Sequence, residues 1–210
     1  MNNPWVRLPD APPYVLPEDL PGAVPFQLHC RMPEPWHGPI TRATVLLLLR
    51  NPGHHLQDLE DSGNPQLVGV WRRQLSGDQP FQYVLPELSW TGGAHYWIAR
   101  LRVLIETVGA ERLSDRFAVA QAIPYASSYE IAPMGSIPSA AYTGALVRAA
   151  LQRGALVIVG RAAHLWANLV PELLVEPTAP VLSQPRAMPT LTPERLGAAL
   201  FEQVVDRLRA

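Results

Sequence analysis

The chain contains no lysine. All 17 of its basic residues are arginine, and they stand against 18 acidic residues, so the formal net charge is -1. This balance excludes a global basic field, and any surface that binds nucleic acid has to be local. It also excludes a phosphate loop of the Gly-x-x-x-x-Gly-Lys type, which requires a lysine. Arginine nevertheless binds phosphate oxygens better than lysine does, because its planar guanidinium can donate two hydrogen bonds at once.

Cysteine and long apolar segments are equally scarce. The single cysteine, Cys30, excludes an internal disulfide framework, a zinc ribbon and a four-cysteine iron–sulfur site. No apolar segment is long enough to span a bilayer, and the amino terminus lacks a signal-peptide pattern. We therefore expect a cytoplasmic protein without a membrane partner. No set of metal ligands is evident, so we expect neither a metal nor another cofactor.

Proline, by contrast, is abundant, with 23 residues, and many of them fall in residues 1–40. Such a segment cannot form a regular helix or a central strand. Its apolar residues, among them Trp5, Tyr14 and Phe26, predict an arm that packs over the rest of the chain. Residues 41–210 are then a single domain, and we expect a monomer.

Three predominantly apolar runs, each bounded by turn residues, predict strands that are buried on both faces. Residues 54–94 show no comparable pattern, and a segment of this length in a compact domain is usually functional or carries small elements of its own. The three runs cover about Thr44–Leu49, Phe117–Ile123 and Ala155–Val159; shorter candidates are Leu173–Val175 and Val181–Ser183, and Phe81–Leu85 is a short strand or an extended piece.

Apolar residues at helical spacing predict four helices between and after these strands. Gly109 and Gly154 are expected to end two of them, and Ser139 and Thr192 to cap the starts of two. Strands and helices thus alternate, which predicts an α/β fold with three layers, α/β/α, around a central, mostly parallel sheet of about four strands. The predicted helices cover about residues 94–108, 139–152, 161–169 and 192–208.

Turn residues follow three of the predicted strands, at Asn51–Gly53, Pro124–Ser128 and Ser183–Arg186. If these strands are parallel neighbours, the three turns meet at one edge of the sheet, where ligands bind in open α/β folds. That edge offers an amide, an aromatic ring, hydroxyls and an arginine, but neither a carboxylate pair nor a Cys–His nucleophile. The alternative for Asn-Pro-Gly is a plain turn after a core strand.

The order of these motifs resembles the uracil-DNA glycosylase superfamily. The similarity is best to its mismatch-specific and single-strand-selective branches, in which an apolar strand runs into Asn-Pro-Gly, here Leu47–Gly53. The strand–helix–strand spacing and a proline-containing last motif before a carboxyl-terminal helix also fit. The resemblance spans roughly residues 40–208 and leaves the proline-rich arm outside it.

The resemblance implies hydrolysis of the N-glycosidic bond of a deaminated or damaged base, with the nucleotide flipped out of DNA into a pocket at the strand ends. Asn51 would orient the attacking water, and Pro52 and Gly53 would line the base pocket. Tyr125 would stack on the base or wall it off. Gln121 would read a base edge, or else is a hydrogen-bonded amide of the core.

The same resemblance implies a DNA-binding surface around this edge. The last motif would enter a groove and hold phosphates, for which arginine is well suited. Catalysis would depend on electrostatic stabilisation of an oxocarbenium-like sugar and a departing base anion, because an amide is not a strong base. The implied DNA contacts are Arg50, Ser127, Ser128, Ser183, Gln184 and Arg186.

The last motif departs from the pattern of the superfamily. Members commonly carry His-Pro-Ser or Asn-Pro-Ser there, whereas this chain has Ser183-Gln-Pro-Arg186. The histidine that would stabilise the leaving base is therefore missing, and His54, just after the first motif, is the expected substitute. His54 and the adjacent His55 are alternatively ordinary surface residues.

Two other functions remain open. One is a nucleic-acid or nucleotide-binding protein on the same fold without hydrolytic activity; the other is an unrelated doubly wound hydrolase in which Asn-Pro-Gly is only a turn. A cluster of arginines around the edge would favour a nucleic-acid partner, and scattered arginines would favour the unrelated hydrolase. The arginines in question are Arg50, Arg72, Arg73, Arg161 and Arg186.

Overall fold

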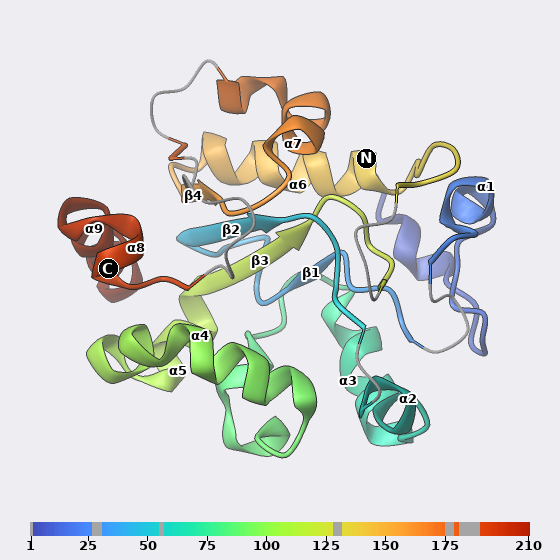
Figure 1. Cartoon of the computed structure of the whole chain (residues 1–210), viewed down its shortest axis with the longest axis horizontal. Coiled ribbons are helices and arrows are strands. Elements are labelled where there is room, and N and C mark those ends of the chain that lie inside the picture. The colour runs from blue at the N-terminus through green and yellow to red at the C-terminus, as the bar shows by residue number, and fades with distance from the viewer. Residues whose placement is uncertain (1, 27–30, 55–56, 128–131, 175–178, 181–189) are drawn as a thin grey trace.

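A four-stranded sheet forms the middle layer of the computed structural model (Figure 1). The strands lie in the order β1-β3-β2-β4, with β2 parallel to both of its neighbours and β1 antiparallel to β3. The strands are β1 (Trp36–His37), β2 (Val45–Leu49), β3 (Phe117–Gln121) and β4 (Leu156–Val159). The described residues are 2–26, 31–54, 57–127, 132–174, 179–180 and 190–210.

Helices cover both faces of the sheet, as the alternating pattern predicts. In Figure 1, α6 (Ala140–Gln152) and α7 (Ala163–Leu169) lie over one face, and α4 (Gly92–Val108) and α5 (Ala110–Arg116) lie over the other. The carboxyl-terminal helix α9 (Ala198–Arg209) packs against α4 and α5. The predicted three-layer α/β/α fold with a mostly parallel sheet of four strands is confirmed.

Short elements make up the rest of the described chain. They fill the arm, the segment between β2 and α4, and the approach to α9. Four are α-helices, namely α1 (Leu20–Ala23), α2 (Gln57–Ser62), α3 (Pro65–Gln74) and α8 (Pro193–Leu196), and five are 3₁₀ turns at Pro4–Arg7, Pro17–Asp19, Gln82–Val84, Pro86–Leu88 and Pro171–Leu174.

The central strands are buried because both of their faces are covered. Every residue of β2 and β3 is buried, and in register Leu47 lies between Val119 and Ile158. On the α4 side, the Phe81 ring packs edge-on against Trp97 and Phe117, with ring centroids 5.4 and 5.3 Å apart. An unbroken apolar run is what a strand between two helical layers requires.

Two of the predicted minor strands are wrong. Gln82–Val84 is a 3₁₀ turn, closed by the Leu85 N–H, which donates to the Gln82 carbonyl at 3.0 Å. Leu173 belongs to the 3₁₀ turn Pro171–Leu174, where proline presets the helical φ at the first position. Val181–Ser183 lies outside the described residues.

Helix boundaries show smaller differences. The helix predicted over 192–208 is interrupted at Gly197, whose φ of 79° separates α8 from α9. Such a backbone conformation suits glycine, which has no Cβ to clash. Helix α5 was not predicted, because the chain turns at Gly109 and resumes a helix directly afterwards. Among the described residues, no helix is both long and apolar enough to cross a membrane.

The proline-rich arm enters the fold more deeply than its composition suggests. Residues 31–40 are all buried, and Trp36 and His37 form the edge strand β1. The proline rule excludes a central strand from this segment, and an edge strand is compatible with it. The arm therefore supplies part of the sheet and part of the core.

Candidate functional site

The chain leaves the carboxyl ends of β2 and β3 toward opposite faces of the sheet. After β2 it continues through α2 and α3 to α4 and α5 on one face, and after β3 it continues to α6 on the other (Figure 1). Neighbouring parallel strands whose connections diverge in this way leave a crevice outside their ends, and ligands bind there in open α/β sheets. This switch point is where Asn51 lies.

The two chains stay paired for several residues beyond the strands. The Ile123 N–H donates to the Arg50 carbonyl at 2.8 Å, and the Ser127 N–H donates to the Pro52 carbonyl at 3.2 Å. Gly53 and Ser127 form an isolated parallel bridge. Backbone hydrogen bonds thus join the turns after β2 and β3, and the two turns lie at one sheet edge, as the sequence predicted.

The Asn51 side chain joins these two turns. Its Nδ2 donates to Ser127 Oγ at 2.9 Å and to the Pro52 carbonyl at 2.8 Å, and it lies 3.4 Å from the Tyr125 carbonyl. Its Oδ1 accepts a hydrogen bond from an Arg50 guanidinium nitrogen at 3.0 Å. These hydrogen bonds fix the orientation of the amide: its nitrogen points to Ser127 and the Pro52 carbonyl, and its oxygen points to the Arg50 guanidinium.

This geometry limits what Asn51 can do chemically. An amide oxygen has two lone pairs, so Oδ1 can accept a second hydrogen bond, and the side chain is half-buried. Among the described residues, no carboxylate and no imidazole hydrogen-bonds to this amide. Asn51 can orient a water molecule or a polar ligand group, but it cannot remove a proton from it.

A second amide lies two residues earlier on the neighbouring strand. Gln121 ends β3 and is 4% exposed, and its buried Oε1 has no hydrogen-bond partner in the part of the chain that the structure describes. It pairs in register with Leu49, and side chains alternate along a strand, so it shares the α4 face of the sheet with Phe117. A buried acceptor that the protein leaves unsatisfied is costly and calls for an explanation.

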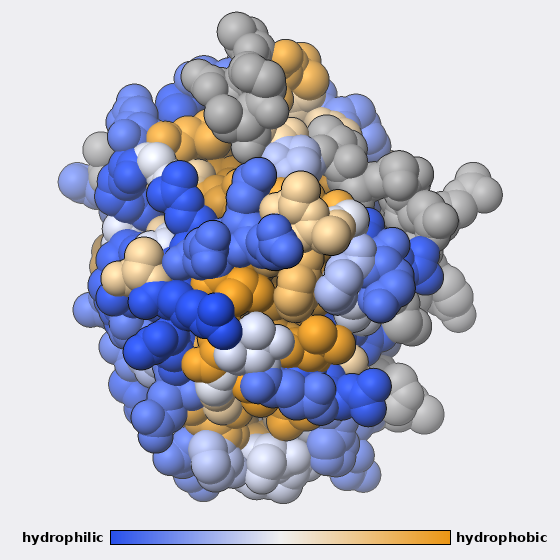
Figure 2. Space-filling model, turned by 90° about the vertical axis from the view of Figure 1, so that its left-hand side faces the viewer, coloured by the Kyte–Doolittle hydropathy of each residue, from blue (hydrophilic) through white to orange (hydrophobic). Residues whose placement is uncertain are grey.

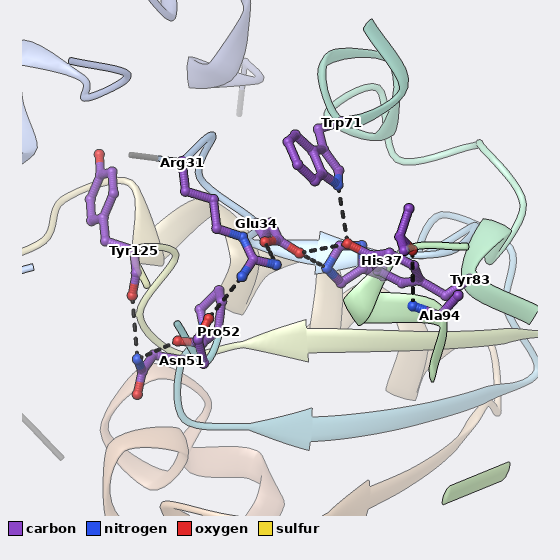
Figure 3. A network of polar contacts seen from close by, with 11 residues as sticks. Arg31, Glu34, His37, Asn51, Pro52, Trp71, Tyr83, Ala94 and Tyr125 are labelled. Carbon is purple, nitrogen blue, oxygen red and sulfur yellow. Dashed lines mark hydrogen bonds and ion pairs between the residues drawn. The ribbon is translucent and has the colours of Figure 1, made fainter. Parts of the chain in front are cut away.

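Tyr125 does not lie where the sequence analysis placed it. In Figure 3 its ring points away from Asn51, and the side chain is 2% exposed, so it offers no exposed face for stacking. The ring packs between Trp5 and Phe26 of the arm, with centroids 6.4 and 6.5 Å away. Only its backbone carbonyl faces the Asn51 amide.

The Tyr125 hydroxyl is part of a buried anchor to the arm. It donates to Asp19 Oδ2 at 2.8 Å, and the same carboxylate accepts hydrogen bonds from the Ser139 N–H, at 2.9 Å, and the Ser139 hydroxyl. Burial, and next the Asp19 carboxylate, raise the pKa of Tyr125 above its usual range. Ser139 precedes α6, so Asp19 ties the β3 turn and the start of that helix to the arm.

A second buried anchor connects the arm to the other turn. Arg31 donates to the Gly53 carbonyl at 2.9 Å and forms an ion pair with Glu34, which also pairs with His37 Nε2 (Figure 3). Burial alone would raise the pKa of the Glu34 carboxyl, but the Arg31 and His37 charges and hydrogen bonds lower it to about 2. Glu34 is therefore ionised at neutral pH.

Aromatic side chains close this cluster on its far side. Tyr83 donates its hydroxyl proton to Glu34 at 3.3 Å, and Trp71 Nε1 donates to the Tyr83 oxygen at 3.0 Å. The Arg31 guanidinium lies 5.9 Å from the centre of the Trp71 ring. The carboxylate thus receives hydrogen bonds from several directions, which is the condition for burying a charge.

The remaining predicted site residues fall into three groups. Pro52 and Ser127 are buried, Gly53 is exposed, and His54 is half-buried directly after the turn. Arg161 follows β4 at the same sheet edge as Arg50, where its N–H donates to the Leu48 carbonyl. Outside the described residues lie Ser128, Ser183, Gln184 and Arg186.

Neither arginine of α3 is placed at the strand ends, and Arg72 binds the arm instead. Arg72 donates to the carbonyls of Leu8 and Pro9, at 3.3 and 2.7 Å, and lies 3.3 Å from Asp10. Arg73 is exposed in the last turn of the same helix. Of the arginines considered for a basic cluster, Arg50 and Arg161 are those that the structure places at the strand ends.

Sequence reasoning missed the arm residues that reach this site: Asp19, Arg31, Glu34 and His37. The one available signal was a set of charged or polar residues, three positions apart, between apolar and proline residues in 31–37. Composition pointed instead to a peripheral arm. Contacts across more than 100 residues of sequence, such as Tyr125 with Asp19, leave no local pattern.

A cavity of about 730 Å³ lies elsewhere, at the amino end of β4. It is lined by the last turn of α6, the start of β4 and one face of α9, including Gln152, Leu156 and Arg207. Figure 2 looks onto this side, where apolar side chains lie in hollows between hydrophilic ones.

Within the described residues, no three His, Cys, Asp or Glu side chains gather as metal ligands.

The fold and the site together define an α/β/α protein with paired polar turns at its switch point. No protein-family model, no curated protein and no solved structure matches this chain.

Proposed function

We propose that this chain is a DNA glycosylase-like enzyme that hydrolyses the N-glycosidic bond of a deaminated or damaged base. The base would be flipped out of DNA and bound at the switch point between β2 and β3. The proposal starts from the resemblance of Leu47–Gly53 to the first motif of the uracil-DNA glycosylase superfamily.

The observation that carries the proposal is the presence of two amides at the paired ends of β2 and β3. Asn51 has its orientation set by Ser127 and Arg50, and Gln121 has a buried oxygen with no hydrogen-bond partner among the described residues. An unsatisfied acceptor at the end of a strand suits a ligand that brings an N–H donor. Bases that carry a ring N–H beside a carbonyl, as uracil, hypoxanthine and xanthine do, have that chemistry.

The chemistry expected of Asn51 follows from its hydrogen bonds. Its Oδ1 would accept a hydrogen bond from water and hold the water for attack on the sugar carbon. The Arg50 guanidinium, which hydrogen-bonds to the same oxygen, would stabilise negative charge that develops on the attacking water. The bond to the base would break first, giving an oxocarbenium-like sugar, so the water needs little activation and electrostatic stabilisation carries the rate. The water proton would leave to solvent or to the departing base.

A binding protein on the same fold is the second candidate. What favours it is that the Asn51 Nδ2 donors are already used by protein acceptors. In addition, no described carboxylate or imidazole hydrogen-bonds to this amide, so no general base is at hand. The same two amides would then recognise a base without cleaving it.

A cleavage assay separates the two. Oligonucleotides carrying uracil, hypoxanthine or xanthine, single-stranded and paired, are incubated with the protein and treated with alkali, which breaks abasic sites. The variants are Asn51→Ala and, as a matched control, Asn168→Ala, since Asn168 is exposed on α7. Cleavage that is lost in Asn51→Ala and kept in Asn168→Ala would support the enzyme.

The other outcomes are equally informative. Salt-sensitive binding without cleavage would overturn the enzyme and leave the binding protein. Neither cleavage nor binding on any of these substrates would reject both DNA functions and favour an unrelated ligand at the switch point.

A further inference from the structure

We propose that the proline-rich arm is part of the site, and that Arg31 is a positioning residue that holds the Asn51–Gly53 turn through a contact separate from those made by the β3 turn. The inference deepens the proposed function and rests on it for the catalytic consequence. The mechanical part, that Arg31 immobilises the turn, stands on the contacts alone.

Hydrogen bonds hold this turn at its exposed end, Gly53. Gly53 is exposed, and a Cβ added to it would have no atom within 4 Å. From the β3 side, Ser127 holds the turn through Pro52 and Asn51. The Gly53 carbonyl separately accepts the Arg31 hydrogen bond at 2.9 Å, two residues after the proposed catalytic amide. Together the Ser127 and Arg31 contacts form a clamp on the turn.

Arg31 is itself rigidly placed. Its side chain is 9% exposed, and while one terminal nitrogen reaches Gly53, the other pairs with Glu34. The ionised Glu34 is held in turn by His37 and Tyr83. A guanidinium has a fixed fork of donors and can serve two acceptors at once, whereas the single ammonium of a lysine is a point charge.

The arm holds the second turn independently. Asp19 accepts hydrogen bonds from the Tyr125 hydroxyl and from Ser139, both buried. The Tyr125 carbonyl faces Asn51 Nδ2, so the arm reaches the neighbours of the proposed catalytic amide from two separate anchors. Both turns of the switch point are therefore braced from outside the strands that carry them.

Arg31→Lys is the test variant, because it keeps a positive charge beside the buried Glu34 and so should preserve the fold. Arg7→Lys is the matched control: the same substitution in the same arm, at an exposed ion pair with Glu18. Hydrogen–deuterium exchange is measured for peptides that cover residues 51–54 and 122–127, together with kcat and KM for oligonucleotide cleavage.

We expect faster exchange at residues 51–54 in Arg31→Lys, with β2 and α6 unchanged and with Arg7→Lys like the wild type. For cleavage we expect kcat to fall by about 10- to 100-fold while KM changes by less than about threefold, as for a misplaced catalytic group. A general loss of structure would lower the melting temperature and raise exchange throughout the chain instead.

The possible failures are distinguishable. Wild-type exchange at residues 51–54 in Arg31→Lys would overturn the clamp, whatever the enzyme does. If the exchange rises but the wild-type protein cleaves nothing, the clamp stands and the proposed function fails. If exchange rises and kcat stays at the wild-type value, Arg31 holds the turn without positioning Asn51 for catalysis, and the inference is refuted.

Discussion

Replacing Gln121 by methionine should make the protein more stable and less active. The side chain is 4% exposed, and no described residue hydrogen-bonds to its buried Oε1. Leaving a buried polar atom unsatisfied costs about 1–3 kcal/mol of folding free energy. Methionine has the same unbranched length and adapts to irregular space, so the substitution removes that cost without opening a cavity.

The expected gain can be measured as a melting temperature. For a chain of this length, 1 kcal/mol corresponds to about 2–4 °C, so Gln121→Met should melt several degrees above the wild type. Gln203→Met, at an exposed position of α9, is the matched control for the effect of methionine alone and should melt within about 2 °C of the wild type.

Activity should change in the opposite direction. If the Gln121 oxygen accepts an N–H of the base, its loss should lower kcat/KM by about 10- to 100-fold. Stability gained and function lost at one position is the signature of a residue kept for binding rather than folding. A lower melting temperature in Gln121→Met would mean that the amide is satisfied in the free protein, for instance by a buried water, and would refute the reasoning.

Three further predictions concern the framework of the site. The pKa of Glu34 lies at about 2 in the folded chain, below its ordinary 4.5, so its contribution to stability is complete above about pH 4.5 and lost toward pH 2; the loss should be on the order of 3 kcal/mol. Urea unfolding from about pH 6 to 2 checks this, and Glu34→Gln should flatten the dependence if Glu34 causes it. Leu47→Asp should unfold the protein, since Leu47 is fully buried in β2; a soluble variant with wild-type melting would contradict the central strand. Tyr125→Phe should cost about 1–3 kcal/mol, because Asp19 loses a buried donor; unchanged melting would show that Ser139 satisfies the carboxylate alone.

The layers of the fold were predictable because their signals are local. The central strands are short, predominantly apolar runs between turn residues, at Val45–Leu49, Phe117–Gln121 and Leu156–Val159. Helix α4 carries its apolar residues at helical spacing. Burial on two faces demands such runs wherever they occur along the chain. Phe81–Leu85 was misread because a short apolar stretch beside proline satisfies a 3₁₀ turn as well as a strand.

The candidate site was predictable only in part. Asn51 and Gln121 could be placed at strand ends from the pattern alone, and the structure keeps them there. The direction of Tyr125 could not, because it depends on Asp19, which is 106 residues away in the sequence. The same holds for Arg31: its sequence neighbours give no sign that its side chain hydrogen-bonds to the Gly53 carbonyl, 22 residues away.

The sequence by itself determined the three central strands and the main helices around them, and that the Asn51 and Tyr125 turns share one sheet edge. Periodicity and turn chemistry act over a few residues, so they can be read along the chain. Only the tertiary structure decided that Asn51 bonds to Ser127, 76 residues later, and that the arm braces both turns. Hydrogen bonds are directional and short-ranged, so which groups meet depends on how the layers pack.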